Sequence, residues 1–258
     1  MNIFRKIAIA ILIGSIMALF GGCGQTELTE QQADELQAKV TAGDKSALET
    51  LTSKAQDGDR LAQYNLGLAY DFGQGVPQDY TQAAQWYRKA AEQNYADAQY
   101  SLGMLHDLGQ GVPQNYGQAL RWYRKAAEQG HSYAQYSMGM LYAFGQGVPR
   151  DYEQAEQWFR KSSAQGNADG LRELGFMYRY GHGVPRNLVA AHALCSLSVA
   201  LDSSANNEAL ACRTKLGEDL NTQESDDSHK LVLQIRSSDW SLQSLDQYIA
   251  TNAPELKK

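Results

Sequence analysis

Two of the three cysteines in this sequence are placed where they could form a disulfide. Cys195 and Cys212 lie on either side of the short polar stretch 202–205, at about equal distances from its centre. Helices that flank this stretch as an antiparallel hairpin would bring the two residues level. In an exported protein this arrangement favours a disulfide, and a loop of about 18 residues adds about 3 kcal/mol of stability in the chain-entropy model. The alternative is a pair of small buried thiols.

The five histidines lack the spacing of a zinc site. They are His106, His131, His182, His192 and His229. The sequence also has no GxSxG nucleophile motif, no phosphate-binding loop and no cysteine–histidine signature. From these observations we expect no metal, no cofactor and no enzymatic activity.

The third cysteine, Cys23, follows a segment with the layout of a secretory signal. Arg5 and Lys6 precede the uncharged apolar run 7–20, and two glycines separate this run from Cys23. The run is short for a bilayer-spanning helix, which needs about 20 apolar residues. Residues 1–22 are therefore predicted to be a signal peptide.

The sequence FGGC at Cys23 resembles a bacterial lipobox, whose cysteine is lipidated and becomes the mature N-terminus. A smaller aliphatic residue is usual in place of the phenylalanine. Gly24 follows instead of aspartate, so the resemblance implies a lipid-anchored protein of the cell envelope, at the outer membrane and facing the periplasm. The alternatives are an ordinary cleaved signal peptide and an uncleaved anchor.

The charge of the chain limits its partners. Without residues 1–22 the chain loses Arg5, Lys6 and no acidic residue, which leaves 21 basic and 29 acidic residues and a formal net charge of −8 with histidine neutral. Nucleic-acid binding depends on lysine and arginine that neutralise phosphates, so we expect no nucleic-acid partner. Anionic lipid would also repel the chain, so membrane contact is expected through the N-terminal lipid alone.

The rest of the chain is organised by a repeat. The segment GLAYDFGQGVP, which begins at Gly67, recurs at steps of 36 residues as GMLHDLGQGVP, GMLYAFGQGVP and GFMYRYGHGVP. A period of this size is typical of stacked supersecondary units. Apolar residues three and four positions apart predict one helix before the GxGVP turn and one after it. The predicted organisation is a signal peptide at 1–22, a tether at 23–28, a degenerate repeat at 29–57, four full repeats at 58–201 and a helical cap at 202–258.

Each unit carries the signals of a helix–turn–helix. Gly73 suits a left-handed helix end, and Asp79 is a strong N-cap residue with Gln82 at capping-box spacing. Gln118 and Gln154 predict the same capping box in the next two repeats, and Ala190 breaks it in the fourth. Gly67 lies inside the first helix, where glycine costs about 1 kcal/mol relative to alanine. We therefore expect an aromatic ring to pack where its Cβ is missing. His106 takes the place of a core-facing tyrosine and is predicted to be a core residue.

This pattern resembles the Sel-one-like repeat (SLR) family, a relative of the tetratricopeptide repeats. The matching positions of the first full repeat are Ala62, Leu66-Gly67, Tyr70, Gly73, Gly75-Val76, Asp79, Ala83, Trp86-Tyr87 and Ala90-Ala91. The resemblance implies an all-α fold, a right-handed α/α superhelical solenoid. Family members with cystines across helix pairs agree with a Cys195–Cys212 bridge. The sequence departs from the pattern at Asn94, at Gly170 and at Leu194-Cys195, which replace a glycine, an alanine and the tryptophan–aromatic pair.

The resemblance also implies a concave face made by the first helices. Alignment on Gly67 places on it Tyr64, Leu68, Asp71, Tyr100, Met104, Asp107, Tyr136, Met140, Arg172, Phe176 and Arg179. Aromatic and methionine side chains suit protein or peptide binding, and the charge changes from acidic to basic along the array. We expect a monomeric scaffold for protein–protein interaction. In the alternative interpretation, the three tyrosines belong partly to the core.

Two other functions remain open from the sequence alone. One is an enzyme or a binder that acts on envelope material such as peptidoglycan or a β-lactam. The other is a secreted effector that binds a glycan or a peptide stem.

Overall fold

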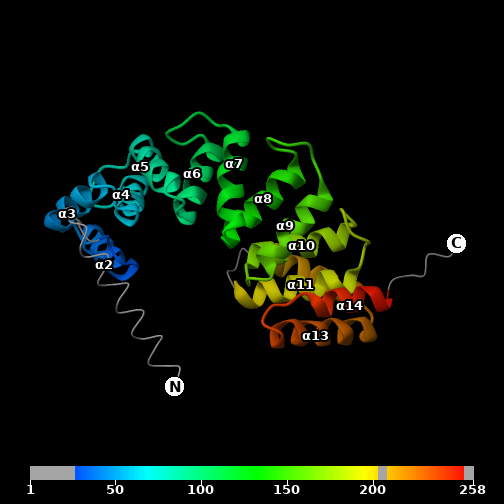
Figure 1. Cartoon of the computed structure of the whole chain (residues 1–258). Coiled ribbons are helices and arrows are strands. Elements are labelled where there is room, and N and C mark those ends of the chain that lie inside the picture. The colour runs from blue at the N-terminus through cyan, green and yellow to red at the C-terminus, as the bar shows by residue number, and fades with distance from the viewer. Residues whose placement is uncertain (1–26, 203–207, 253–258) are drawn as a thin grey trace, which may run out of the picture.

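The computed structural model describes residues 27–202 and 208–252 of the chain. Within these ranges it contains thirteen helices and no strand, which confirms the all-α class (Figure 1). The helices are α2 (Glu30–Thr41), α3 (Lys45–Gln56), α4 (Arg60–Phe72), α5 (Tyr80–Glu92), α6 (Ala96–Leu108), α7 (Tyr116–Glu128), α8 (Ser132–Phe144), α9 (Tyr152–Ser163), α10 (Ala168–Tyr180), α11 (Leu188–Leu201), α12 (Glu208–Asp219), α13 (Thr222–Ser237) and α14 (Gln243–Asn252).

Successive helices pair as hairpins that stack into an open arc (Figure 1). The pairs α4–α5, α6–α7, α8–α9 and α10–α11 are the four predicted repeats, and α2–α3 precede them. The helices α12 to α14 pack on the last pair and close the C-terminal end of the stack. Helix–turn–helix units therefore repeat along the chain, as the 36-residue period predicts. None of the described helices combines the length and the apolar character needed to cross a bilayer.

The turns form as their residue types predict. In the first full repeat Gly73 ends α4 in a left-handed conformation with φ of 67°, and Gly75 also has a positive φ, of 71°. The Asp79 side chain then accepts hydrogen bonds from the backbone N–H groups of Thr81 and Gln82, so it caps α5. The same glycine and cap arrangement recurs in the other three repeats.

The predicted capping boxes are wrong in α5, α7 and α9. Gln82, Gln118 and Gln154 donate backbone N–H groups to their caps, but these described helices lack the return bond from the glutamine side chain. The reason is that the backbone N–H of each cap residue already has an acceptor. The Asp79 N–H donates to the carbonyl of Tyr70 in the preceding helix at 2.9 Å, and the later repeats have equivalent bonds.

The glycine inside each first helix receives an aromatic ring from the second helix. A Cβ on Gly67 would lie 2.5 Å from the ring of Tyr87. The corresponding contacts are Gly103 with Tyr123 at 2.6 Å and Gly139 with Phe159 at 2.5 Å. All three rings are almost completely buried. The prediction that these glycines make room for rings is confirmed.

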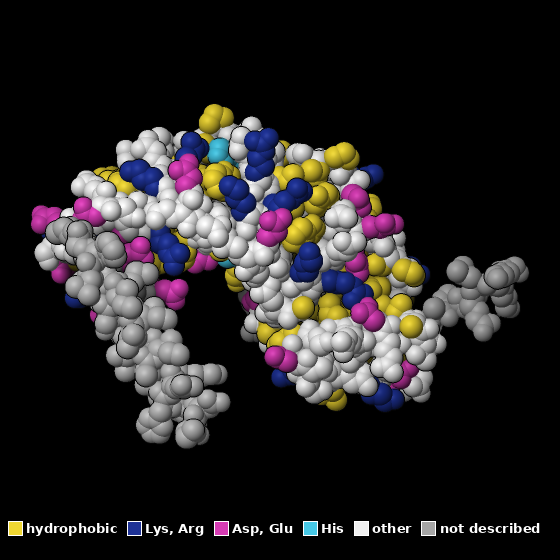
Figure 2. Space-filling view, viewed as in Figure 1, with side chains coloured by type: hydrophobic (Ala, Val, Ile, Leu, Met, Phe, Trp, Pro, Cys, Tyr) yellow, Lys and Arg dark blue, Asp and Glu magenta, His cyan; other side chains and the backbone are white. Residues whose placement is uncertain are grey.

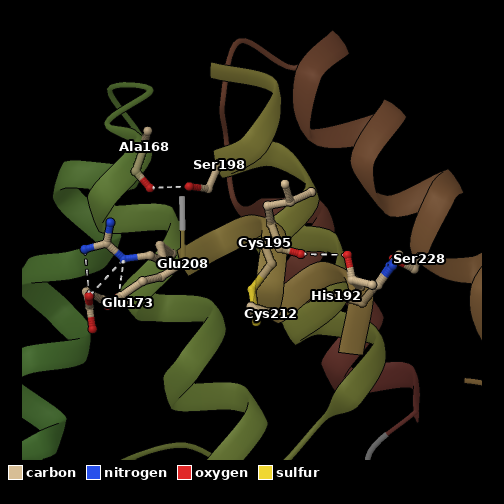
Figure 3. The surroundings of a disulfide bond; sticks show 11 residues. Ala168, Glu173, His192, Cys195, Ser198, Glu208, Cys212 and Ser228 are labelled. Atoms are coloured by element: carbon tan, nitrogen blue, oxygen red, sulfur yellow. Dashed lines mark hydrogen bonds and ion pairs between the residues drawn. A yellow bond between two sulfur atoms is a disulfide. The ribbon is translucent and has the colours of Figure 1, made fainter. Parts of the chain in front are cut away.

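The fourth repeat fills the same space with sulfur. Cys195 lies 36 residues after Phe159, and its Sγ is the atom that a Cβ on Gly175 would meet, at 2.9 Å. In the structure Cys195 is bonded to Cys212 of α12, with 6.2 Å between the two Cα atoms (Figure 3). Both residues are buried in the core that α9 to α14 share. The bond thus fastens the C-terminal cap to the last repeat.

Candidate functional site

The first helices of the repeats line the inner side of the arc. Their side chains meet across repeat boundaries: the Tyr64 and Tyr95 rings are 5.1 Å apart, and those of Tyr100 and Tyr133 are 6.2 Å apart. Figure 2 shows that the underside of the arc is hollowed. We call this hollowed surface of α2, α4, α6, α8 and α10 the inner face.

Three of the predicted concave-face residues are tyrosines, and they form the floor of the inner face. The Tyr64, Tyr100 and Tyr136 rings are half-buried and pack against the core rings beneath them. The ring-centroid distances are 5.7 Å for Tyr64–Tyr87, 5.7 Å for Tyr100–Tyr123 and 5.9 Å for Tyr136–Phe159. Each tyrosine therefore belongs partly to the core and partly to the surface. Burial raises the pKa of Tyr64 and of Tyr136 to about 12, so both hydroxyls are neutral at physiological pH.

Four residues further along each first helix, the next predicted residue is a half-buried apolar side chain. These are Leu68, Met104, Met140 and Phe176, and each packs on the edge of a core cluster. Together with the tyrosines they form a strip of half-buried aromatic and apolar side chains on the inner face. A strip of this composition suits contact with another polypeptide.

The two aspartates predicted on the concave face each have a structural partner. The Tyr87 hydroxyl donates to Asp71 at 2.8 Å, and the Tyr123 hydroxyl donates to Asp107 at 3.1 Å. Burial raises the pKa of both carboxyl groups, and these hydrogen bonds oppose the rise. In the third repeat a phenylalanine replaces the tyrosine and Ala143 replaces the aspartate, so the two partners are lost together.

Tyr123→Phe is expected to lower the free energy of unfolding by about 1.5 kcal/mol at pH 7, because a half-buried carboxylate loses a hydrogen bond. The raised pKa of Asp107 means that its contribution to stability is largest below the unfolded pKa and is lost as pH rises through the folded pKa. Without the hydroxyl this pKa rises further, so the deficit should be smaller at pH 4 than at pH 7. Urea unfolding at the two pH values measures it.

The double variant Tyr123→Phe/Asp107→Ala reproduces the natural Phe159–Ala143 pair and is the matched control. It should recover part of the lost stability at pH 7. Equal deficits for Tyr123→Phe at pH 4 and pH 7 would show that the hydroxyl does not act on an ionised carboxylate.

At the basic end of the inner face, Arg172 is surrounded by carboxylates. Arg172 lies 2.5 Å from Asp169 and 3.0 Å from Glu173, and Glu208 of α12 is 3.7 Å away. Arg179 lies over the ring of Tyr180, at 5.2 Å from its centroid. The predicted change from acidic to basic along the array is therefore wrong around Arg172, because neighbouring carboxylates surround this guanidinium.

His106, His192 and the two bonded cysteines are held by packing, a hydrogen bond and the disulfide. His106 is buried, which confirms its prediction as a core residue, and burial lowers its pKa. His192 is hydrogen-bonded to Ser228 at 2.8 Å, close to the Cys195–Cys212 bond (Figure 3). Across residues 27–202 and 208–252, no group of three or more histidine, cysteine or acidic residues is arranged to hold a metal ion. Cys23 lies outside the described residues.

One surface feature was missed in the sequence. The last residue of each first helix is large, apolar and more than half exposed. These residues are Phe72, Leu108, Phe144 and Tyr180, which we call the edge row. An apolar residue directly before the helix-ending glycine, at 36-residue steps, was the signal that could have revealed it.

Comparison with known families agrees with this architecture. The Sel1 repeat model matches residues 60–95, 96–131, 132–167 and 168–203, so the chain belongs to the Sel1 repeat family. Each match begins two residues later than the predicted repeat. Sel1 repeat proteins generally are scaffolds for protein–protein interaction and typically have no enzymatic activity.

Solved structures resemble the fold. A Sel1 repeat protein from Oxalobacter formigenes is 29% identical, with 78% of this chain and 86% of that chain covered and a TM-score of 0.64. A protective antigen of uropathogenic Escherichia coli with an SLR fold is 25% identical, with 88% and 65% covered and a TM-score of 0.47. An immunity protein from Pseudomonas aeruginosa is 21% identical, with 84% and 86% covered and a TM-score of 0.48. No curated protein matches the chain.

Proposed function

We propose that this protein is a scaffold of the bacterial cell envelope that binds a protein or peptide along its inner face. The observation that carries the proposal is the strip of half-exposed tyrosine, methionine and leucine side chains on consecutive first helices. Rigid helices hold these side chains, so a partner would not have to order them on binding. The general role of Sel1 repeat proteins supports the same interpretation.

We further propose that a lipid on Cys23 holds the scaffold at the outer membrane, facing the periplasm, and that the scaffold is monomeric. The apolar run before Cys23 and the FGGC sequence support the anchor. The net negative charge of the chain supports attachment through the lipid instead of through anionic headgroups.

The test is cross-linking in the native envelope, followed by membrane isolation and pull-down. The variant Tyr100→Ala/Tyr136→Ala should reduce the yield of partner about tenfold. This change corresponds to a loss of about 1.4 kcal/mol of binding free energy. The control Phe72→Ser/Phe144→Ser changes the edge row and should leave the yield unchanged. Circular dichroism checks that both variants are folded.

Three results would contradict the proposal. A folded inner-face variant that captures the same partners at the same yield would remove the inner face as the binding surface. Loss of partners in the edge-row variant alone would move the binding surface to the edge row. Turnover of nitrocefin or of labelled peptidoglycan by the purified chain would instead favour the enzyme.

A further inference from the structure

The inner face contains a cavity near its N-terminal end. The cavity has a volume of about 280 Å³ and lies between α2, α4 and the start of α6. Three carboxylic acids and two tyrosines are among the residues that line it, namely Glu30, Asp34, Asp97, Tyr64 and Tyr95. Lysine and arginine are absent from the described lining. The cavity therefore combines concentrated negative charge with two aromatic rings.

The two rings and the carboxylates line the same cavity. Tyr64 and Tyr95 meet edge to face, with an angle of 69° between their planes. Burial, followed by the charge of Asp97, raises the pKa of Tyr64 to about 12 and also raises the pKa of Tyr95. Both shifts agree with a negative potential at the rings. Carboxylates beside exposed aromatic faces are the surroundings that a lysine or arginine side chain prefers.

The chain itself shows how the equivalent place is filled two repeats later. Asp169 and Tyr136 there correspond to Asp97 and Tyr64. Arg172 lies between them, with one guanidinium nitrogen 2.5 Å from the Asp169 carboxylate and another 3.5 Å from the Tyr136 hydroxyl. The chain thus supplies its own cation to this second site.

Among the described residues, no lysine or arginine forms an ion pair with Asp97. The position of Arg172 is taken by Tyr100, whose ring stacks on His131 at a centroid distance of 4.7 Å. Asp97 lies beside His131, with 3.2 Å between Nε2 and Oδ1, and Nδ1 of the same ring accepts a hydrogen bond from the backbone N–H of Ala134. Glu30 and Asp34 in α2 are exposed. The N-terminal site therefore has the carboxylate and the tyrosine of the occupied site, together with two further acids. The guanidinium of Arg60 lies over the Tyr95 ring, 5.9 Å from its centroid, and among the described residues it forms no ion pair with Asp97.

We propose that this cavity binds a lysine or arginine side chain of an extended partner segment. The inference rests on the proposed function, because it specifies the partner of the same inner face. The cationic group lies between Asp97 and the acids of α2, against the Tyr64 and Tyr95 rings. The rest of the segment runs along the tyrosine strip toward Tyr136. The preferred partner is a basic, extended polypeptide.

The test measures the binding of two fluorescein-labelled peptides to the full chain by fluorescence anisotropy. One peptide is four repeats of Arg-Gly-Ser, and the other is four repeats of Glu-Gly-Ser. The arginine peptide should bind and the glutamate peptide should not. Asp97→Asn should weaken arginine-peptide binding about tenfold, because a side chain of the same shape loses its charge.

Asp169→Asn is the matched control. It removes the same charge at the equivalent position, where Arg172 already occupies the site, and it should leave the affinity for the arginine peptide within about twofold of the wild type. A second variant, Glu30→Gln/Asp34→Asn, should weaken binding in the same direction as Asp97→Asn. Circular dichroism confirms folding of each variant.

Three outcomes overturn the inference: equal affinity for the two peptides, equal effects of Asp97→Asn and Asp169→Asn, or unchanged binding in both cavity variants. Failure of this inference can be distinguished from failure of the proposed function. If Tyr100→Ala/Tyr136→Ala loses its envelope partners while the cavity variants keep them, the inner face still binds but not through a basic side chain in this cavity.

Discussion

Gly111→Ala is expected to lower the free energy of unfolding by about 3 kcal/mol, although it adds a single methyl group. Gly111 has φ of 67°, and a Cβ there would lie 2.2 Å from the backbone carbonyl of Tyr80 at the start of α5. The turn of one repeat rests at this point on the second helix of the repeat before it. Backbone atoms cannot rotate away as a side chain can, so the two repeats must separate.

Gly130→Ala is the matched control for this prediction. Gly130 also has a positive φ, of 92°, but a Cβ there would have no neighbour within 4 Å. Its expected cost is about 1 kcal/mol, from the backbone conformation alone. Asn94 occupies the same place in the preceding repeat with φ of 63°, so this position accepts a side chain.

Urea unfolding, followed by circular dichroism at the helical band, measures both variants. The midpoint for Gly111→Ala should fall well below that for Gly130→Ala. Similar losses in the two variants would mean that backbone conformation alone sets the cost and that the contact between turn and helix adds nothing.

The elements that depend on neighbouring residues could be predicted from the sequence. Gly73 ends α4 and Asp79 caps α5 because each acts within a few residues of its own position. The ring against Gly67 could also be predicted, since a helical glycine that recurs at one phase needs a packing reason. These local rules fix the hairpins, and the period fixes their stacking.

The missing capping boxes and the charge of the inner face depended on contacts between distant segments. The Asp79 backbone N–H reaches the Tyr70 carbonyl because the turn folds back on its own helix, and cap residue types do not reveal this. Arg172 is neutralised partly by Glu208, which belongs to the cap beyond the repeats. Its pairing with Asp169, three residues earlier on the same helix, could have been read from the sequence.

Removal of the Cys195–Cys212 bond is expected to lower the free energy of unfolding by about 3 kcal/mol, the chain-entropy value for a loop of this size. The two residues are separated by 17 positions in the sequence. The variant Cys195→Ala/Cys212→Ala should show this loss, and a reductant should produce a similar loss in the wild type and none in the variant. Thiol labelling of the non-reduced protein gives an independent check, because modification of both cysteines would show that the bridge is absent.

The loss should be concentrated at the C-terminal end of the array. In a stacked repeat protein each unit is stabilised by its immediate neighbours, so a weakened interface opens locally before the whole chain unfolds. The bond joins α11 to α12, and Cys212 shares one buried cluster with Leu216, Leu231 and Ile235 of the cap. Hydrogen exchange should therefore accelerate in α12 to α14 of the alanine variant and stay unchanged in α4 to α7. Acceleration spread evenly over all helices would instead indicate that the cap and the repeats unfold as one unit.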